Sequence, residues 1–184
     1  LGSPGFAPRR GRTVNPAAVL FQALGQDDLA VRVAEALPWV AMTYPGLDWA
    51  WLVREMKLKD LQNRLGFVIA LARDLAERVG RGGAVRSLSV VLEQLERARL
   101  VREDTLGRAT MSPLERRHVE ERRGATARHW NLLTTLTRDD LVHELVQRHP
   151  VALERDRTGE IDEARHDRLD PVHLLDHILC RLGG

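Results

Sequence analysis

The stretch from Asp60 to Gly80 constrains the fold more than any other part of the sequence. Its apolar residues recur three and four positions apart, a spacing that places them on one stripe of a helix. The stripe contains Leu61, Leu65, Val68, Ile69, Ala72, Leu75, Ala76 and Val79, and it is widened by Phe67, Ala70 and Leu71. A stripe this wide predicts a helix enclosed by neighbours, with Asp60 as its N-cap and Gly80 as a left-handed stop. We expect it to be the central helix of an all-α protein.

Similar patterns on both sides of this helix predict an all-α, multi-helix orthogonal bundle. This fold class allows one small β-hairpin, or wing, near residues 100–111. The predicted division assigns residues 1–12 to a tag remnant and basic arm and 13–80 to an N-terminal helical domain. It assigns residues 81–136 to a winged-helix-like segment with the following Arg-rich helix, and 137–184 to a C-terminal helical segment.

The charge balance limits the classes of partner. The chain has 28 basic and 26 acidic residues, so it is not a bulk polycation, although a local basic face is compatible with this balance. Lys57 and Lys59 are the only lysines, and the arginine excess supplies forked groups suited to phosphate or carboxylate.

Cys180 is the only cysteine, which excludes an intrachain disulfide and predicts a cytoplasmic, reducing environment. No apolar run approaches the roughly 20 residues that a membrane span needs.

The most specific pattern lies between residues 84 and 111. An amphipathic helix ends in Leu-x-x-Ala-x-Leu-Val and is followed by a charged strand, a Gly-containing turn and a second short strand. This order resembles the recognition helix and wing of winged-helix DNA-binding proteins. The resemblance implies that Leu100 and Val101 tuck under the helix and that Gly107 lets the chain reverse. The resemblance also places Arg102 and Arg108 beside the wing tip, where they would contact DNA phosphates.

A second pattern also points to DNA. The predicted helix from Trp49 to Leu58 meets the central helix with almost no linker, as in a helix-turn-helix. Gln, Asn and Arg at the start of the second helix are side chains that read base edges. Across both patterns, the residues predicted to contact DNA are Arg86, Arg97, Arg102, Arg108, Lys57, Lys59, Gln62, Asn63 and Arg64.

Two further patterns have a structural interpretation. The sequence Ser112-Pro113-Leu114-Glu115 is a capping box that starts a helix rich in Arg and Glu, which favours a solvated helix laced with ion pairs. An acidic or nucleic-acid partner is the alternative for that helix. The three tryptophans Trp39, Trp49 and Trp51 are predicted to seal the N-terminal core, because large rings contribute most buried area.

One constellation has the spacing of a zinc site. His173, His177 and Cys180 fall at i, i+4 and i+7 of a predicted last helix from Val172 to Leu182. The glutamate that a metalloprotease needs after the first histidine is missing. Because paired histidines are common on exposed helix faces, we predict no metal and no cofactor. The sequence also lacks a Gly-rich phosphate loop and a Gly-x-Ser-x-Gly elbow, so no catalytic residue is predicted.

These patterns leave three function classes. The first is a bacterial DNA-binding transcriptional regulator or antitoxin-like protein that contacts duplex phosphates through arginine. The alternative is a non-catalytic helical protein–protein interaction module of a larger regulator or defence complex. A zinc-dependent enzyme fragment comes third. The predicted partners are therefore double-stranded DNA and a protein partner or homodimer, with no membrane.

Overall fold

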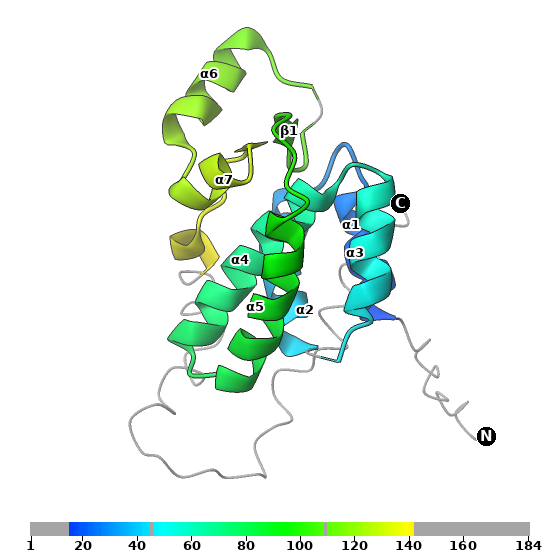
Figure 1. Ribbon diagram of the computed structural model, residues 1–184. Coiled ribbons are helices and arrows are strands. Elements are labelled where there is room, and N and C mark those ends of the chain that lie inside the picture. Colours follow the sequence, from blue (N-terminus) through cyan, green and yellow to red (C-terminus); the bar gives the residue numbers. More distant parts are fainter. Residues whose placement is uncertain (1–14, 45, 109, 142–184) are drawn as a thin grey trace, which may run out of the picture.

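A computed structural model describes residues 15–44, 46–108 and 110–141. This part of the chain is helical apart from one pair of short strands, so the predicted all-α class is confirmed (Figure 1). The elements in chain order are α1 (Pro16–Leu24), α2 (Val31–Thr43), α3 (Trp49–Leu58), α4 (Gln62–Arg78), α5 (Gly82–Glu96), β1 (Asp104–Thr105), α6 (Pro113–Arg122), α7 (Ala125–His129) and β2 (Leu132–Leu133). The predicted basic arm, the possible zinc ligands and the predicted last helix lie outside the described residues.

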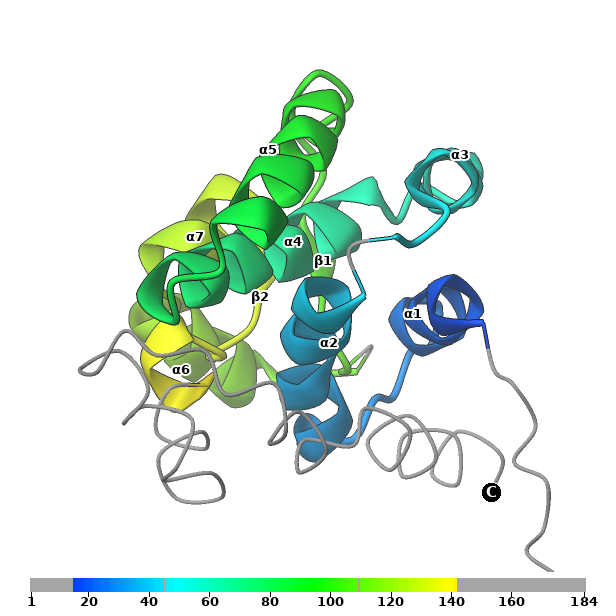
Figure 2. The same cartoon turned by 90° about the horizontal axis from the view of Figure 1, so that it is seen from below.

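The predicted central helix is α4. Phe67, Val68 and Ile69 are fully enclosed, as the width of the apolar stripe predicts. Helix α5 runs back along α4, α2 packs on another side of it, and α1 lies beside α3 (Figures 1 and 2). One hydrophobic cluster contains residues from both sides of the predicted boundary at residue 80. No helix in the described ranges has the length and apolarity that crossing a bilayer requires.

The two ends of α4 differ from each other in how well the sequence predicted them. Gly80 has a φ of 71°, which confirms the left-handed stop. The predicted N-cap at Asp60 is wrong, because Leu61 holds that position and Asp60 itself has a φ of 57°. Aspartate tolerates this left-handed conformation better than most residues. The result is a tight α3–α4 turn, in which the Leu61 N–H donates to the Met56 carbonyl at 2.9 Å.

Local signals predicted several other features correctly. The Asn15 side chain accepts from the Ala17 N–H at 3.0 Å, with Pro16 in the first helical turn. Ser112 and Glu115 form the predicted capping box at the start of α6. The tryptophans at positions 39, 49 and 51 pack partly buried against the core, as expected.

The predicted wing hairpin is wrong. Strand β1 pairs in parallel with β2, placing Asp104 opposite Leu132 and Thr105 opposite Leu133. The following turn packs inward: Leu106 is buried, and the Gly107 carbonyl accepts from the Leu29 N–H at 3.2 Å. A Cβ on Gly107 would lie 2.9 Å from the Leu29 oxygen, so this close approach requires glycine. Strand β1 therefore pairs with a strand that follows α7, not with the residues directly after the Gly107 turn.

Candidate interaction surface

Three side chains predicted to read DNA lie inside the protein. Gln62, Asn63 and Arg64 form the first turn of α4 and are 5%, 1% and 6% exposed. Each of the three side chains forms hydrogen bonds to distant parts of the chain, although the Gln62 Oε1 atom is buried without a partner among the described residues. This burial counts against the predicted DNA contact of these three residues, since base readout requires side chains that reach the groove.

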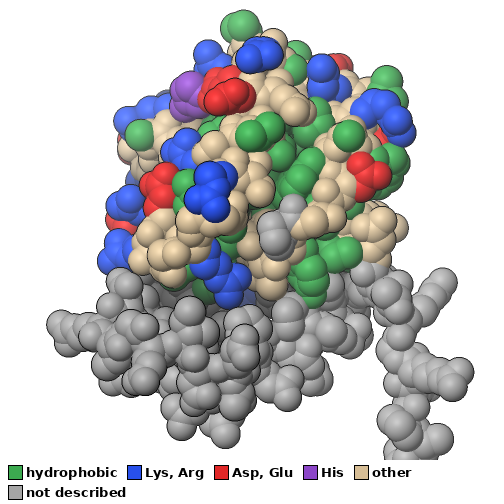
Figure 3. All heavy atoms as spheres, turned by 60° about the horizontal axis from the view of Figure 1, so that its bottom comes forward, with side chains coloured by type: hydrophobic (Ala, Val, Ile, Leu, Met, Phe, Trp, Pro, Cys, Tyr) green, Lys and Arg blue, Asp and Glu red, His purple; other side chains and the backbone are tan. Residues whose placement is uncertain are grey.

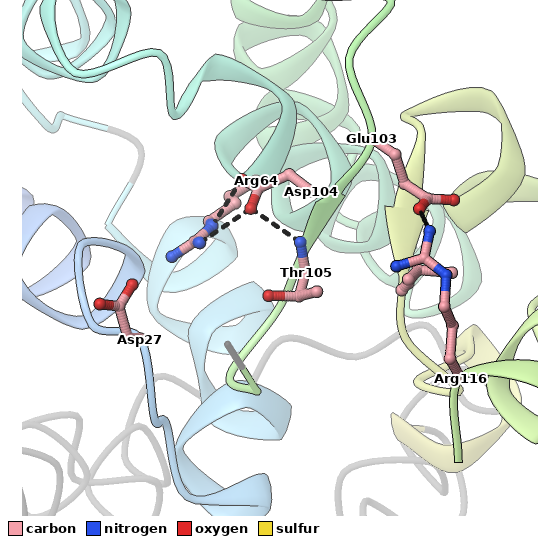
Figure 4. A pocket seen from close by; sticks show the side chains of 7 residues that line it. Asp27, Arg64, Glu103, Asp104, Thr105 and Arg116 are labelled. Carbon is pink, nitrogen blue, oxygen red and sulfur yellow. Dashed lines mark hydrogen bonds and ion pairs between the residues drawn. The ribbon is translucent and has the colours of Figure 1, made fainter. Parts of the chain in front are cut away.

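Arg64 joins three segments of the fold. Its Nε and Nη2 atoms donate to the two carboxylate oxygens of Asp104, at 2.8 and 2.9 Å (Figure 4). Its Nη1 donates to the carbonyls of Leu24 and Gln26, both at 3.0 Å. The forked guanidinium suits this arrangement, because it satisfies a carboxylate through two parallel bonds. Arg64 thereby connects α4 to the α1–α2 connection and to β1.

The segment that follows α5 is held against the same turn. The Asn63 side chain accepts from the Leu100 N–H and donates to the Leu100 carbonyl, both at 2.9 Å. The Asn131 amide donates to the same carbonyl at 2.8 Å, and the Gln62 amide donates to the Ala98 carbonyl at 3.1 Å. These bonds place residues 98–100 directly beside the start of α4.

A polar hollow of about 250 Å³ opens next to Arg64 (Figure 4). It is lined by Asp27, Arg64, Glu103, Asp104, Thr105, Arg116 and Leu133. Two pairs of opposite charges already occupy it, Arg64 with Asp104 and Arg116 with Glu103. Within the described ranges no group of three His, Cys, Asp or Glu side chains is placed to hold a metal ion. The hollow is best described as the outer edge of a structural ion-pair network.

The other six residues predicted to contact DNA are exposed, and four of them gather at one end of the bundle. Lys57 and Lys59 lie at the end of α3, and Arg97 and Arg102 follow α5. The bonds from Gln62 and Asn63 to residues 98–100 bring these two segments together. Lys59 stacks over the Phe21 ring at 5.1 Å. Lys57, Arg97 and Arg102 form no ion pair within the part of the chain that the structure describes.

The remaining two lie elsewhere. Arg86 belongs to the first turns of α5, which point to the opposite end of the bundle (Figure 1). Arg108 follows the buried turn at Gly107, and its Nη1 lies 3.5 Å from a Glu115 carboxylate oxygen at the start of α6. The nine predicted residues therefore do not form a single DNA-binding surface.

Sequence reasoning missed two apolar residues at the basic end. Leu58 is 75% exposed and Val101 is 94% exposed. The prediction that Val101 tucks under the helix is wrong, because Asn63 and Asn131 hold the backbone of Leu100. A signal for Leu58 was present, since it lies between two lysines and off the buried side of α3. We call Lys57, Leu58, Lys59, Arg97, Val101 and Arg102 the basic–apolar end.

A second surface, towards the opposite end of the bundle, has a similar mixed character. On the face that Figure 3 shows, hydrophobic side chains gather with Lys and Arg side chains around them. Val85 of α5 and Trp49 of α3 are only partly buried against the core. Apolar and basic groups are therefore interspersed here, unlike on a surface made of charge alone.

Comparison of the chain with protein-family models, curated proteins and solved structures found no match.

Proposed function

We propose that this chain is a non-catalytic protein-binding module whose basic–apolar end binds an acidic and apolar segment of a partner protein. The observation that carries the proposal is the exposure of Leu58 and Val101 beside basic side chains that form no ion pair with any residue that the structure describes. Fully burying a Val or Leu side chain gains about 1.5–3 kcal/mol. Arginine adds orientation, because it binds carboxylates through a planar fork.

The apolar residues favour a protein over a polynucleotide. Contacts to the DNA backbone come from basic and polar groups, and exposed Leu58 and Val101 add nothing to them. Protein interfaces instead combine an apolar centre with a polar, solvent-accessible rim. In the basic–apolar end, Lys57, Lys59 and Arg102 flank the two apolar side chains. The basic–apolar end therefore has the composition of such an interface.

Double-stranded DNA is the second candidate, in the role of a regulator or antitoxin-like protein. The observation in its favour is that Lys57, Arg97 and Arg102 lie close together without an acidic partner among the described residues. Neutralising several phosphates releases counterions, so binding of this kind weakens steeply as salt rises. Both candidates use the same surface, and each has its own test.

A photo-crosslinking residue at position 101 tests the proposal in cells of the source organism. Position 31 is the matched control, because Val31 is also apolar, 70% exposed and followed by an arginine. We expect a discrete protein adduct from position 101 and none from position 31. The captured segment should be rich in Asp, Glu and apolar residues, and Leu58→Ser should abolish the adduct. Equal capture at both positions, or none at position 101, would contradict the proposal.

A salt series on duplex DNA tests the second candidate. The variant Arg97→Glu/Arg102→Glu reverses charge at the basic–apolar end, and Arg78→Glu is the control at the far end of α4. If DNA is the partner, affinity falls steeply with salt and is lost in the double variant alone. Weak binding that both variants reduce equally indicates a non-specific charge effect and removes DNA as a candidate.

A further inference from the structure

Helix α5 packs one side against α4 and exposes the opposite side. Ala84, Leu88, Val91, Leu92 and Leu95 are its buried residues. Arg86, Val90, Glu93 and Arg97 recur at i, i+4, i+7 and i+11 on the exposed side, which places them on one stripe. Val90 at the middle of the stripe is 58% exposed. An apolar residue thus lies between side chains of opposite charge.

The charges on this stripe are unused within the described part of the molecule. Neither Arg86 nor Glu93 takes part in an ion pair there, whereas Glu96 on an adjacent side pairs with Arg99 and His129. Arg86 precedes Val90 by four residues and Glu93 follows it by three. When two copies of this stripe lie antiparallel, the positive end of each meets the negative end of the other, so the stripe is complementary to itself.

We propose that α5 pairs with α5 of a second copy of this chain, antiparallel about a two-fold axis between Ser89 and Val90. A two-fold interface applies the same patch to itself, so each contact occurs twice. With the axis at this point, Arg86 of each copy lies level with Glu93 of the other, about 5 Å along the helix from the axis. Val90 lies level with Ser89 of the second copy. The two Val90 side chains are therefore next to the axis, between the two Arg86–Glu93 pairs.

The glycines at the start of α5 fit the same arrangement. Gly82 of one copy lies level with Arg97 of the other, and Gly83 lies level with Glu96. A Cβ on Gly83 would meet nothing within 4 Å, and one on Gly82 would meet only the Arg86 side chain. The outer ends of the stripe therefore leave room for the long side chains that approach them. Two helices packed along such a stripe cross at a shallow angle, on the order of 20°.

The contact covers one helix per copy, so it is smaller than a stable dimer interface, which buries on the order of 1,600 Å² in total. The dimer is therefore in exchange with monomer, and its fraction rises with protein concentration. Arg97 belongs to both surfaces, whereas Arg86 and Glu93 lie outside the basic–apolar end. Variants at positions 86 and 93 therefore test self-association without changing a residue of the proposed partner-binding surface.

Sedimentation velocity on the full chain tests the pairing across a concentration series. We expect the wild type to shift from monomer towards dimer as concentration rises. Arg86→Glu places four carboxylates around the axis, and Glu93→Arg places four guanidinium groups there, so each variant stays monomeric. An equimolar mixture of the two variants restores a dimer, because every level pair is again of opposite charge. The double variant Arg86→Glu/Glu93→Arg restores it for the same reason.

Arg117→Glu on α6 is the matched control and leaves the dimer fraction unchanged. Far-ultraviolet circular dichroism of each variant checks that the helices are intact. A wild type that is monomeric at every concentration overturns the proposal. So does a mixture of the two single variants that stays monomeric although both are folded.

Discussion

The first turn of α4 and the helix α6 contain the same residue type in opposite environments. The Arg64 side chain is 7% exposed, and its bonds reach a carboxylate and two carbonyls on distant segments. The Arg116 side chain is 50% exposed and pairs with Glu103 and Glu120 at the surface. Helix α6 buries only Val119, and it stands apart from the bundle (Figure 1).

This difference shows that an arginine's neighbours in space, not those in sequence, decide its role. A surface ion pair contributes about 0–1 kcal/mol, because water screens both partners. Removing one partner of a buried pair costs about 3–5 kcal/mol, because the other charge is left without compensation. Arg64 is therefore expected to govern folding, while arginines on the outer side of α6 remain available to solvent or to a partner.

The largest effect is expected from Arg64→Ala. It leaves the Asp104 carboxylate and the Leu24 and Gln26 carbonyls without their donor, so we expect a loss of about 3–5 kcal/mol of unfolding free energy. Chemical denaturation measures it. Arg64→Lys should recover only part of the loss, because an ammonium cannot make the two parallel bonds.

Arg117→Ala on α6 is the matched control for this comparison. Arg117 is exposed and forms no ion pair within the described ranges, so its removal should change stability by less than about 0.5 kcal/mol. Equal effects of the Arg64 and Arg117 substitutions would show that the two regions do not differ in the way the structure indicates.

A smaller effect is expected from Gly66→Ala, one helical turn into the interior region. A Cβ at Gly66 would lie 2.3 Å from Cζ3 and 2.4 Å from Cη2 of Trp130, which is 1% exposed. Overpacking of this kind costs about 1–3 kcal/mol. Denaturation of a double-mutant cycle with Trp130→Leu isolates the clash, because alanine at position 66 should cost nothing once the ring is gone. An equal cost in both backgrounds would contradict this explanation.

The smallest effect concerns the capping box of α6. Hydrogen bonds from the backbone N–H and then the hydroxyl of Ser112, with the charge of Arg108, lower the pKa of Glu115. A lowered folded-state pKa means that the ionised cap stabilises α6 above the ordinary glutamate pKa. This contribution is lost as pH falls through the lowered pKa.

An NMR titration of Glu115 measures this shift. Ser112→Ala removes the hydroxyl donor, so the pKa of Glu115 should rise towards its ordinary value. The acid-induced loss of helical chemical shifts in α6 should then begin at a higher pH, while α4 stays unchanged. A Glu115 pKa that does not respond to Ser112→Ala would show that the box is not what holds this end of α6.

The helices were predictable where local signals agreed. The stripe that contains Leu65 and Ile69, the Asn15 and Ser112 caps and the stop at Gly80 each depend on residues within a few positions of one another. The parallel pairing of β1 with β2 was not predictable in this way, because Asp104 and Leu132 are far apart in the sequence. The glycine turn at Gly107 predicted a reversal of the chain but not its packing against Leu29.

The candidate surface was predicted only in part. Lys57, Lys59, Arg97 and Arg102 were expected to be exposed, and they are. Gln62, Asn63 and Arg64 have the residue types of a DNA-reading helix start, yet they satisfy carbonyls and a carboxylate of the same chain. Residue type alone cannot distinguish these roles, since the same donors serve a base edge and a backbone carbonyl equally well.

The sequence by itself determined where helices form, because helical periodicity and capping act over three or four residues. Only the tertiary structure decided which polar side chains face inward and which apolar ones face out. That decision depends on whether a partner such as the Asp104 carboxylate or the Leu100 backbone lies within bonding distance. Burying a polar group is costly unless it is paired. Burial of Arg64 and exposure of Val101 therefore follow from contacts between segments that are distant in sequence.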